Sequence, residues 1–190
     1  MSEPQRYDVF DTARGFVAIA WSAEGVTSLR LPTGSPAAAE HALLKRVPGA
    51  VRATPPPAIA SVVAAARRYF AGEAVDFRDV AVDFGAPEPF FARVYARIRT
   101  LGWGETTTYG AIAKDLGAGP EAARDVGKAM AANPVPLIVP CHRVLAAGGK
   151  LGGFSAPGGT DTKRWMLENE GAAPRPEPAA TASSQTTFGF

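Results

Sequence analysis

The stretch Gly85-Ala86-Pro87-Glu88-Pro89 divides the chain into two parts of different character. Proline and glycine at this density interrupt regular secondary structure, so we expect a domain boundary here. Strand-like and helical patterns are mixed before the stretch, and helical spacing dominates after it. The sequence therefore predicts an α/β (α+β) fold, with an N-terminal α/β domain at residues 1–86 and a mostly helical second domain at residues 87–173.

Before the boundary, residues 7–31 carry apolar runs separated by short turns, a pattern that favours an antiparallel meander. Helical spacing of apolar residues follows over 36–46 and, more strongly, over 58–70. Apolar and polar residues alternate over the segment 75–84, as in a further strand, and this pattern places Val80, Val82 and Phe84 on one face. We expect a small antiparallel sheet packed against helices.

After the boundary, residues 90–101 have helical spacing, and Thr108 is a suitable N-cap for a helix over 109–116. A glycine-rich break separates that helix from a second one over 121–132. The pair has the length of a helix-turn-helix that enters a DNA groove, although two short helices that simply pack together give the same pattern.

The charge balance does not indicate a nucleic-acid partner, because 20 Lys and Arg against 18 Asp and Glu leave a net charge of only +2. Any DNA would have to be met by a local basic patch. The chain has no targeting segment and no apolar run long enough for a bilayer, so we expect a cytoplasmic protein without a membrane partner. Residues 174–190, rich in Pro, Ala, Ser and Thr, are predicted to form a disordered tail.

A single cysteine, Cys141, excludes an internal disulfide and any zinc site built from several cysteines. With only two histidines in the chain, we expect no metal. Cys141 is then either a buried structural residue, which is the usual place for a lone intracellular cysteine, or a reactive thiol.

The segment 133–144 favours the reactive thiol. The segment reads Asn-Pro-Val-Pro-Leu-Ile-Val-Pro-Cys-His-Arg-Val. A short apolar run between prolines therefore ends at Cys141, which is followed directly by His142 and Arg143. A nearby cation lowers a thiol pKa, and His142 could serve as the base, directly or through a bridging water. An orienting carboxylate would complete the set. Two candidates stand at the end of an apparent helix: Glu168 and Glu170.

Several strings in a fixed order resemble the O6-alkylguanine-DNA alkyltransferases. They are Gly104-Glu105-Thr106-Thr107-Thr108-Tyr109-Gly110, Ala122-Ala123-Arg124-Asp125-Val126-Gly127, Pro140-Cys141-His142-Arg143-Val144 and Gly152-Gly153-Phe154-Ser155. The similarity covers about residues 90–171, and before it the match is only architectural. The resemblance implies a ribonuclease-H-like N-terminal sheet and a helix-turn-helix in the second domain.

The resemblance also implies a suicide DNA-repair reaction, in which Cys141 takes a methyl or other alkyl group from O6-alkylguanine. Activity on O4-alkylthymine stays open. In this family pattern Cys141, His142 and Glu170 form a relay, and Tyr109 donates a proton to the leaving guanine. Asn133 would tie the recognition helix to the active-site loop and steady His142. No cofactor is implied.

The implied partner is double-stranded DNA, bound by a monomer through the minor groove with the alkylated guanine flipped out. Arg124 would fill the stack that the base vacates. The residues expected to contact DNA are Ala123, Arg124, Gly127, Lys128 and Arg143. Those expected to frame the base pocket are Val144, Gly152, Phe154 and Ser155. Arg93, Arg97, Arg99 and Lys128 are candidate phosphate contacts, although ordinary exposed helix charges give the same pattern. Lys163 matches a family lysine near the same pocket, but surface lysines are usually solvated, and we rank it low.

The chain departs from the family pattern at two places: Phe154 stands where a tyrosine is usual, and Leu101-Gly102 where an Ile-Pro pair is usual. Three other functions remain to be weighed. Alkyltransferase-like proteins bind lesions without transfer but lack the cysteine. A helix-turn-helix transcription factor would be a dimer on a palindromic site, and a cysteine hydrolase would turn over.

Overall fold

The computed structural model describes residues 4–172. Its first half contains β1 (Arg6–Thr12), β2 (Gly15–Trp21), β3 (Val26–Thr33), α1 (Pro36–Leu44), β4 (Val51–Arg52) and α2 (Pro57–Phe70). Its second half contains α3 (Pro89–Arg99), β5 (Thr107–Thr108), α4 (Tyr109–Asp115), α5 (Ala123–Ala132), β6 (Val144–Leu145) and α6 (Gly159–Asn169), with short 3-10 helices at Pro120–Ala122, Cys141–Arg143 and Ala147–Gly149. The expected mixed α/β fold is confirmed, and the predicted tail lies outside the described residues.

The four-stranded sheet has the order β3-β2-β1-β4. The predicted meander is present, because β1 pairs antiparallel with β2 and β2 antiparallel with β3. Gly15 begins β2 with φ of 121°, and a Cβ there would lie 2.5 Å from the carbonyl oxygen of Thr33, so only glycine fits this turn. The sequence did not predict β4, a two-residue strand parallel to β1.

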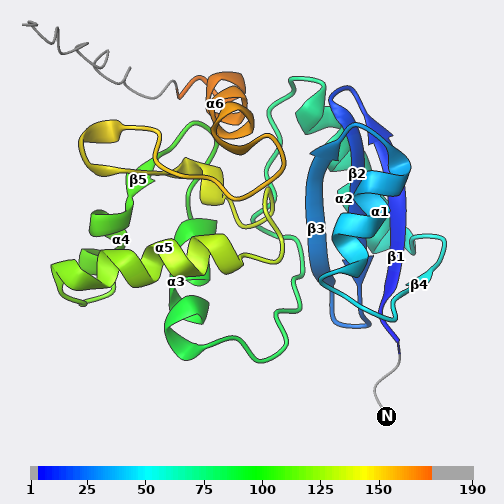
Figure 1. The fold of residues 1–190 in the computed structure, drawn as a ribbon, viewed down its shortest axis with the longest axis horizontal. Helices are drawn as coiled ribbons and strands as arrows, with labels where there is room; N and C mark the ends of the chain where they lie inside the picture. The colour runs from blue at the N-terminus through cyan, green and yellow to red at the C-terminus, as the bar shows by residue number, and fades with distance from the viewer. Residues whose placement is uncertain (1–3, 173–190) are drawn as a thin grey trace, which may run out of the picture.

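Helices cover both faces of the sheet, with α1 on one side and α2 on the other (Figure 1). Ala18 and Ala20 of β2 pack in the cluster that includes Leu43 of α1. The alternate residues Val17 and Ile19 pack in the cluster that includes α2. A strand buried on both faces needs apolar residues at every position, which explains the unbroken apolar run of β2.

The prediction of a strand over residues 75–84 is wrong, except that one residue in this segment forms a β-bridge. Val82 forms a single bridge with Val26, through hydrogen bonds from Val26 N to the Ala81 oxygen (3.0 Å) and from Asp83 N to the Val26 oxygen (2.9 Å). Val75 and Phe77 are buried in the core without strand pairing. Their alternation therefore reflects burial from a loop rather than a place in the sheet.

The second half is mostly helical, as predicted. Glu88 caps α3 by accepting the N–H of Phe91 (3.1 Å), and Thr108 caps α4 by accepting that of Ala111 (3.1 Å). A tight turn and a 3-10 helix separate α4 from α5, and α5 packs against both α4 and α3. Within residues 4–172, no helix is long and apolar enough to cross a membrane.

One hydrophobic cluster runs through both halves. It joins Ile19 of β2 and Tyr69 of α2 to Val94 of α3 and Val139 of the segment before Cys141. Figure 1 shows β3, the edge strand, on the side of the sheet that faces the second half. The division into two domains near residue 87 stays a prediction, since the core is continuous across it.

Candidate active site

The segment that leads to Cys141 is held by the side chain of Asn133, which ends α5. Its amide Nδ2 donates to the carbonyl of Val139 (2.9 Å), and its Oδ1 accepts the N–H of Val135 (3.0 Å). Leu137, between them, has φ of 80°, an uncommon conformation for a residue with a side chain. Asn133 therefore ties α5 to the active-site segment, as expected, while no hydrogen bond from it to His142 is found among the described residues.

The first half of the chain holds the same segment at the carbonyl oxygen of Pro134. This oxygen accepts the backbone N–H of Leu29 (2.9 Å), the hydroxyl of Ser28 (3.3 Å) and Nη2 of Arg30 (3.1 Å). All three donors belong to the edge strand β3. The unpaired edge of the sheet thus positions the active-site segment, a role that sequence reasoning missed.

Cys141 is 6% exposed and begins a short 3-10 helix. Burial raises the pKa of its thiol, while the Asn133 side chain and the positive charge of Lys163 act in the opposite direction. The sequence had suggested His142 and Arg143 as the cations that would stabilise a thiolate. The charge that acts on Cys141 comes instead from Lys163, because Arg143 is paired with Glu170.

His142 is completely buried and lies 2.7 Å from Oε1 of Glu170 through Nε2. Burial lowers the pKa of His142, against the opposing effect of Glu170, so the ring is neutral near pH 7. A carboxylate accepts hydrogen bonds, so Nε2 carries the proton and Nδ1 keeps a free lone pair. Nδ1 is buried and has no partner among the described residues. It is the basic atom of the site.

Glu170, rather than Glu168, is the carboxylate that meets His142. Glu170 is 4% exposed, whereas Glu168 is exposed. Burial alone would raise the pKa of Glu170, but the hydrogen bonds that His142 and Arg143 donate to it, together with the positive charge of Arg143, outweigh burial and lower that pKa to about 2. Glu170 is therefore a fixed negative charge behind the imidazole.

Arg143 corrects the sequence prediction, which placed it on DNA. Its Nε and Nη2 donate to the two carboxylate oxygens of Glu170 (2.7 and 3.1 Å), and its Nη1 donates to the carbonyl of Leu101 (2.7 Å). The residue is only 6% exposed. A guanidinium whose donors are used inside the protein cannot reach a phosphate, so Arg143 neutralises and positions Glu170.

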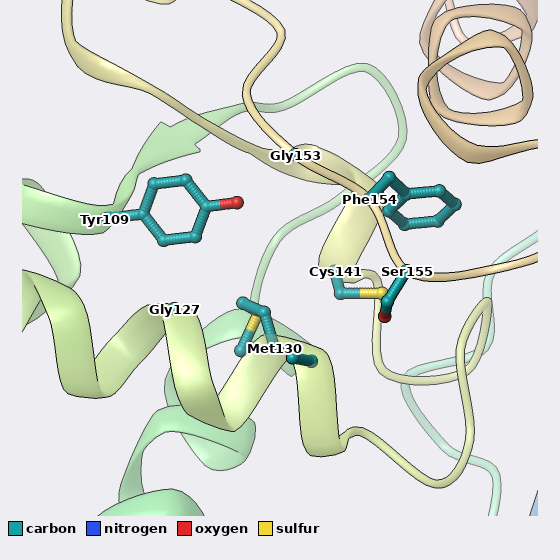
Figure 2. Close-up of a pocket in the computed structure, with 8 residues that line it drawn as sticks. Tyr109, Gly127, Met130, Cys141, Gly153, Phe154 and Ser155 are labelled. Carbon is teal, nitrogen blue, oxygen red and sulfur yellow. The ribbon is translucent and has the colours of Figure 1, made fainter.

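A pocket of about 360 Å³ opens beside Cys141. Figure 2 shows it between Tyr109 of α4, Met130 of α5 and the loop that carries Phe154 and Ser155. Its lining residues are Tyr109, Gly127, Met130, Ala131, Cys141, Gly153, Phe154 and Ser155. Burial, and then the charge of Cys141, raise the pKa of Tyr109, so its hydroxyl keeps a proton to donate.

Two of the expected pocket residues, Val144 and Gly152, do not line this space. Val144 is buried, and its carbonyl accepts a hydrogen bond from Nζ of Lys163 (2.6 Å). Gly152 has φ of 69°, and a Cβ there would lie 3.5 Å from the ring of Tyr109, so it supports the pocket wall from behind. Phe154 and Ser155 line the pocket, and their contact with a base stays a prediction.

Lys163 is the residue that sequence reasoning ranked too low. It is completely buried rather than solvated, and Nζ lies 5.8 Å from the ring centre of Tyr109 and 5.9 Å from that of Phe154. Burial lowers the pKa of Lys163 to about 8, although the charge of Cys141 works the other way. Its match to a family lysine was the available signal.

The residues expected on DNA from α5 form a small surface. Arg124 and Lys128 are exposed, Lys128 pairs with Asp125 (2.8 Å), Ala123 is half-buried, and Gly127 faces the pocket. The other expected phosphate contacts are engaged within the protein. Arg93 donates to the Leu116 carbonyl, Arg97 pairs with Asp115, and Arg99 donates to the carbonyls of Arg78 and Val80. In the described part of the chain, no group of three His, Cys, Asp or Glu residues could hold a metal ion.

Comparisons with known proteins show which family the chain resembles. Residues 89–172 match the family described as "6-O-methylguanine DNA methyltransferase, DNA binding domain". The chain is 47% identical over 118 residues to the methylated-DNA--protein-cysteine methyltransferase of Mycobacterium tuberculosis, covering 62% of this chain and 68% of the relative. It is 44% identical over 108 residues to a DNA base-flipping protein of Thermus thermophilus, covering 57% of this chain and 70% of that protein.

Solved structures extend the similarity to the whole fold. The structure of Mycobacterium tuberculosis OGT in complex with DNA matches with a TM-score of 0.70 and 37% identity, over 89% of this chain and 95% of that one. The O6-methylguanine-DNA methyltransferase of Pyrococcus kodakaraensis matches with a TM-score of 0.65 and 26% identity, over 88% of this chain and 99% of that one. The chain belongs to the O6-methylguanine-DNA methyltransferase family.

Proposed function

We propose that this protein repairs O6-alkylguanine in DNA by one irreversible transfer of the methyl or other alkyl group to Sγ of Cys141. The observation that carries the proposal is the position of Cys141 in the wall of a 360 Å³ pocket, next in sequence to a neutral His142 that Glu170 holds. That volume is within the range of pockets that enclose a small molecule.

The chemistry follows from the protonation states of the site. Nδ1 of His142, which has no partner among the described residues, accepts the proton of the thiol through a bridging water, and the thiolate attacks the alkyl carbon on guanine O6. The bond from that carbon to O6 breaks, and its electron pair passes to the guanine, which takes a proton from the hydroxyl of Tyr109. A thioether remains on Cys141. No group in the pocket reverses this step, so each molecule acts once.

The helix pair α4 and α5 would bind double-stranded DNA as a helix-turn-helix, with α5 in the minor groove and the damaged guanine flipped into the pocket. Exposed Arg124 supports this role, since a planar cation can fill the stack that the base leaves. Small residues support it too: a Cβ added at Gly127 would meet no atom within 4 Å, which leaves room beside the pocket. We expect the protein to act as a monomer.

We also infer a ribonuclease-H-like arrangement for the first half. Its support is the sheet order β3-β2-β1-β4, with three antiparallel strands followed by a strand parallel to β1. The boundary near residue 87 and the separation into an N-terminal domain and an alkyltransferase domain belong to the same proposal. In it, β3 and α2 of the first half hold the active-site segment and Glu170.

Intact mass after mixing with a duplex that contains O6-methylguanine tests the proposal. Wild-type protein should gain one methylene unit, about 14 Da, in proportion to the lesion, while Cys141→Ser should gain none. Product should never exceed the amount of protein. Turnover beyond one equivalent, or an unchanged mass with the lesion consumed, would contradict a suicide transfer and favour a hydrolase.

A second candidate is a lesion-binding protein without transfer. The name of the Thermus thermophilus relative, a DNA base-flipping protein, favours this alternative. It predicts that wild-type protein binds the O6-methylguanine duplex more tightly than undamaged DNA and keeps its original mass. The same mass measurement, run beside a binding assay, separates the two functions.

A further inference from the structure

A second, smaller hollow lies against Cys141, between the two halves of the chain. Its volume is about 90 Å³, and Arg30 and Arg46 of the first half line it together with Asn133 and Cys141. Met130, Ala131, Phe154 and Ser155 line both this hollow and the larger pocket. The two spaces are therefore neighbours around one thiol, and one of them is edged by arginines.

Neither arginine has an acidic partner in the described part of the chain. The ion pairs found within residues 4–172 include neither of them. Arg30 donates to the carbonyls of Leu29 and Pro134 through Nε and Nη2, and its Nη1 makes no hydrogen bond within that range. Arg46 is exposed, and none of the hydrogen bonds between described residues involves its side chain.

The arginines also repel one another. Burial lowers the pKa of Arg30 to about 10, and the charge of Arg46 lowers it further in the same direction. Two like charges beside a partly buried hollow raise the free energy of the protein unless an anion joins them. Guanidinium groups suit a phosphate in particular, because their donors match its oxygens in pairs.

We propose that Arg30 and Arg46 bind a backbone phosphate of the damaged strand next to the flipped nucleotide, so that the first half of the protein contacts DNA directly. The inference rests on the proposed function. A flipped nucleotide stays joined to its strand, so phosphates must pass the mouth of the base pocket. The hollow shares five wall residues with that pocket, Cys141 among them, and adds two cations that have no acidic partner within residues 4–172.

Arg46→Ala is the variant of choice, because Arg46 makes no internal bond, whereas Arg30 also holds the Pro134 carbonyl. Lys45→Ala is the matched control: it removes the same charge from the neighbouring exposed residue, which does not line the hollow. Affinity for a duplex containing O6-methylguanine is measured in a Cys141→Ser background between about 50 and 200 mM salt. Arg46→Ala should weaken binding about fivefold or more and reduce the salt slope by about 1, and Lys45→Ala should change neither. Equal effects of the two variants would overturn the proposal.

Replacing single phosphates of the duplex by uncharged linkages shows which phosphate Arg46 contacts. Single methylphosphonates are placed in turn at each linkage around the lesion. One linkage beside the lesion should weaken binding of protein with Arg46 intact, and should weaken binding of Arg46→Ala less, because only Arg30 then contacts that phosphate. If every linkage weakens both proteins equally, no phosphate is bound by Arg46 and the proposal fails.

Free O6-benzylguanine base separates this failure from failure of the proposed function, because the base carries the reactive group without a phosphate. Wild-type protein that gains the benzyl mass on Cys141 retains the proposed chemistry, whatever the DNA results for Arg46→Ala. Wild-type protein that gains no mass from either the base or methylated DNA overturns the proposed function itself.

Discussion

The hydroxyl of Tyr69 in α2 donates a 2.9 Å hydrogen bond to Oε1 of Glu170, 101 residues later in the chain. The same oxygen receives Nε2 of His142 at 2.7 Å. Burial and the negative charge of Glu170 both raise the pKa of Tyr69, so its hydroxyl stays a donor. The first half of the protein therefore fixes the carboxylate that orients His142, the proposed base.

Tyr69→Phe should lower the free energy of unfolding by about 1.5–3 kcal/mol, the usual range for a hydrogen bond to a charged group, and should slow alkyl transfer. Urea denaturation and single-turnover rates measure the two effects. Tyr95→Phe is the matched control, since the hydroxyl of Tyr95 is also buried but donates to the carbonyl of Ala129 (2.9 Å). If both variants slow transfer equally, Tyr69 has no special part in the site.

The low pKa of Glu170 makes the protein sensitive to acid. Its folded pKa of about 2 lies below the ordinary value of 4.5, so the stability that it contributes is complete above pH 4.5 and is lost as the pH falls toward 2. The difference corresponds to about 3 kcal/mol. Urea denaturation between pH 7 and 3 should show this loss in wild type. A Glu170→Gln variant with the same pH dependence would refute the assignment.

Substitutions of Arg143 and Arg124 should have different effects, the first on stability and the second on DNA binding. Arg143→Ala leaves the buried charge of Glu170 without its bidentate partner and should cost about 3–5 kcal/mol of unfolding free energy. Arg124→Ala, at an exposed position, should leave stability within about 0.5 kcal/mol and weaken binding to duplex DNA. Denaturation and fluorescence anisotropy are the two measurements. If Arg143→Ala instead left stability unchanged and weakened DNA binding, Arg143 would be a DNA contact after all.

Lys163 should impose an upper pH limit on transfer. Its pKa of about 8 means that the charge that favours the Cys141 thiolate disappears above that pH. The rate should therefore stop rising near pH 8, and Lys163→Met should be slower at pH 7 with a higher thiol pKa, measured by thiolate absorbance. A folded-state pKa below the ordinary 10.5 favours the neutral amine, so stability should increase as the pH rises from about 8 to 10.5. A rate profile unchanged by the substitution would remove Lys163 from the mechanism.

The parts of the fold that the sequence predicted are those with long periodic signals. The meander and the helices α2 and α3 have apolar residues at regular spacing over ten residues or so, whereas the strand β4 has two residues and depends on β1 for its conformation. The alternation in residues 75–84 was misleading because a buried loop can place every second side chain inward. Local pattern cannot separate that loop from a strand.

The residues of the site also divide into those that the sequence identified and those that it missed. Cys141 and His142 are adjacent, and the family motif identified Glu170 from its position. Tyr69 and Arg30 reach the site from α2 and β3, and nothing in their local sequence indicates it. Arg143, a cation within the motif, was expected on DNA, and its burial against Glu170 depends on packing that a linear motif does not contain.

The burial of Cys141 also bears on how the protein survives before it meets damaged DNA. A molecule with one thiol and one use is lost if an oxidant converts that thiol to a sulfenic or sulfinic acid. Oxidants attack exposed thiolates fastest, and Cys141 is 6% exposed with a raised pKa. The packing that buries Cys141 therefore also protects each molecule's single reactive thiol from oxidation before the protein meets damaged DNA.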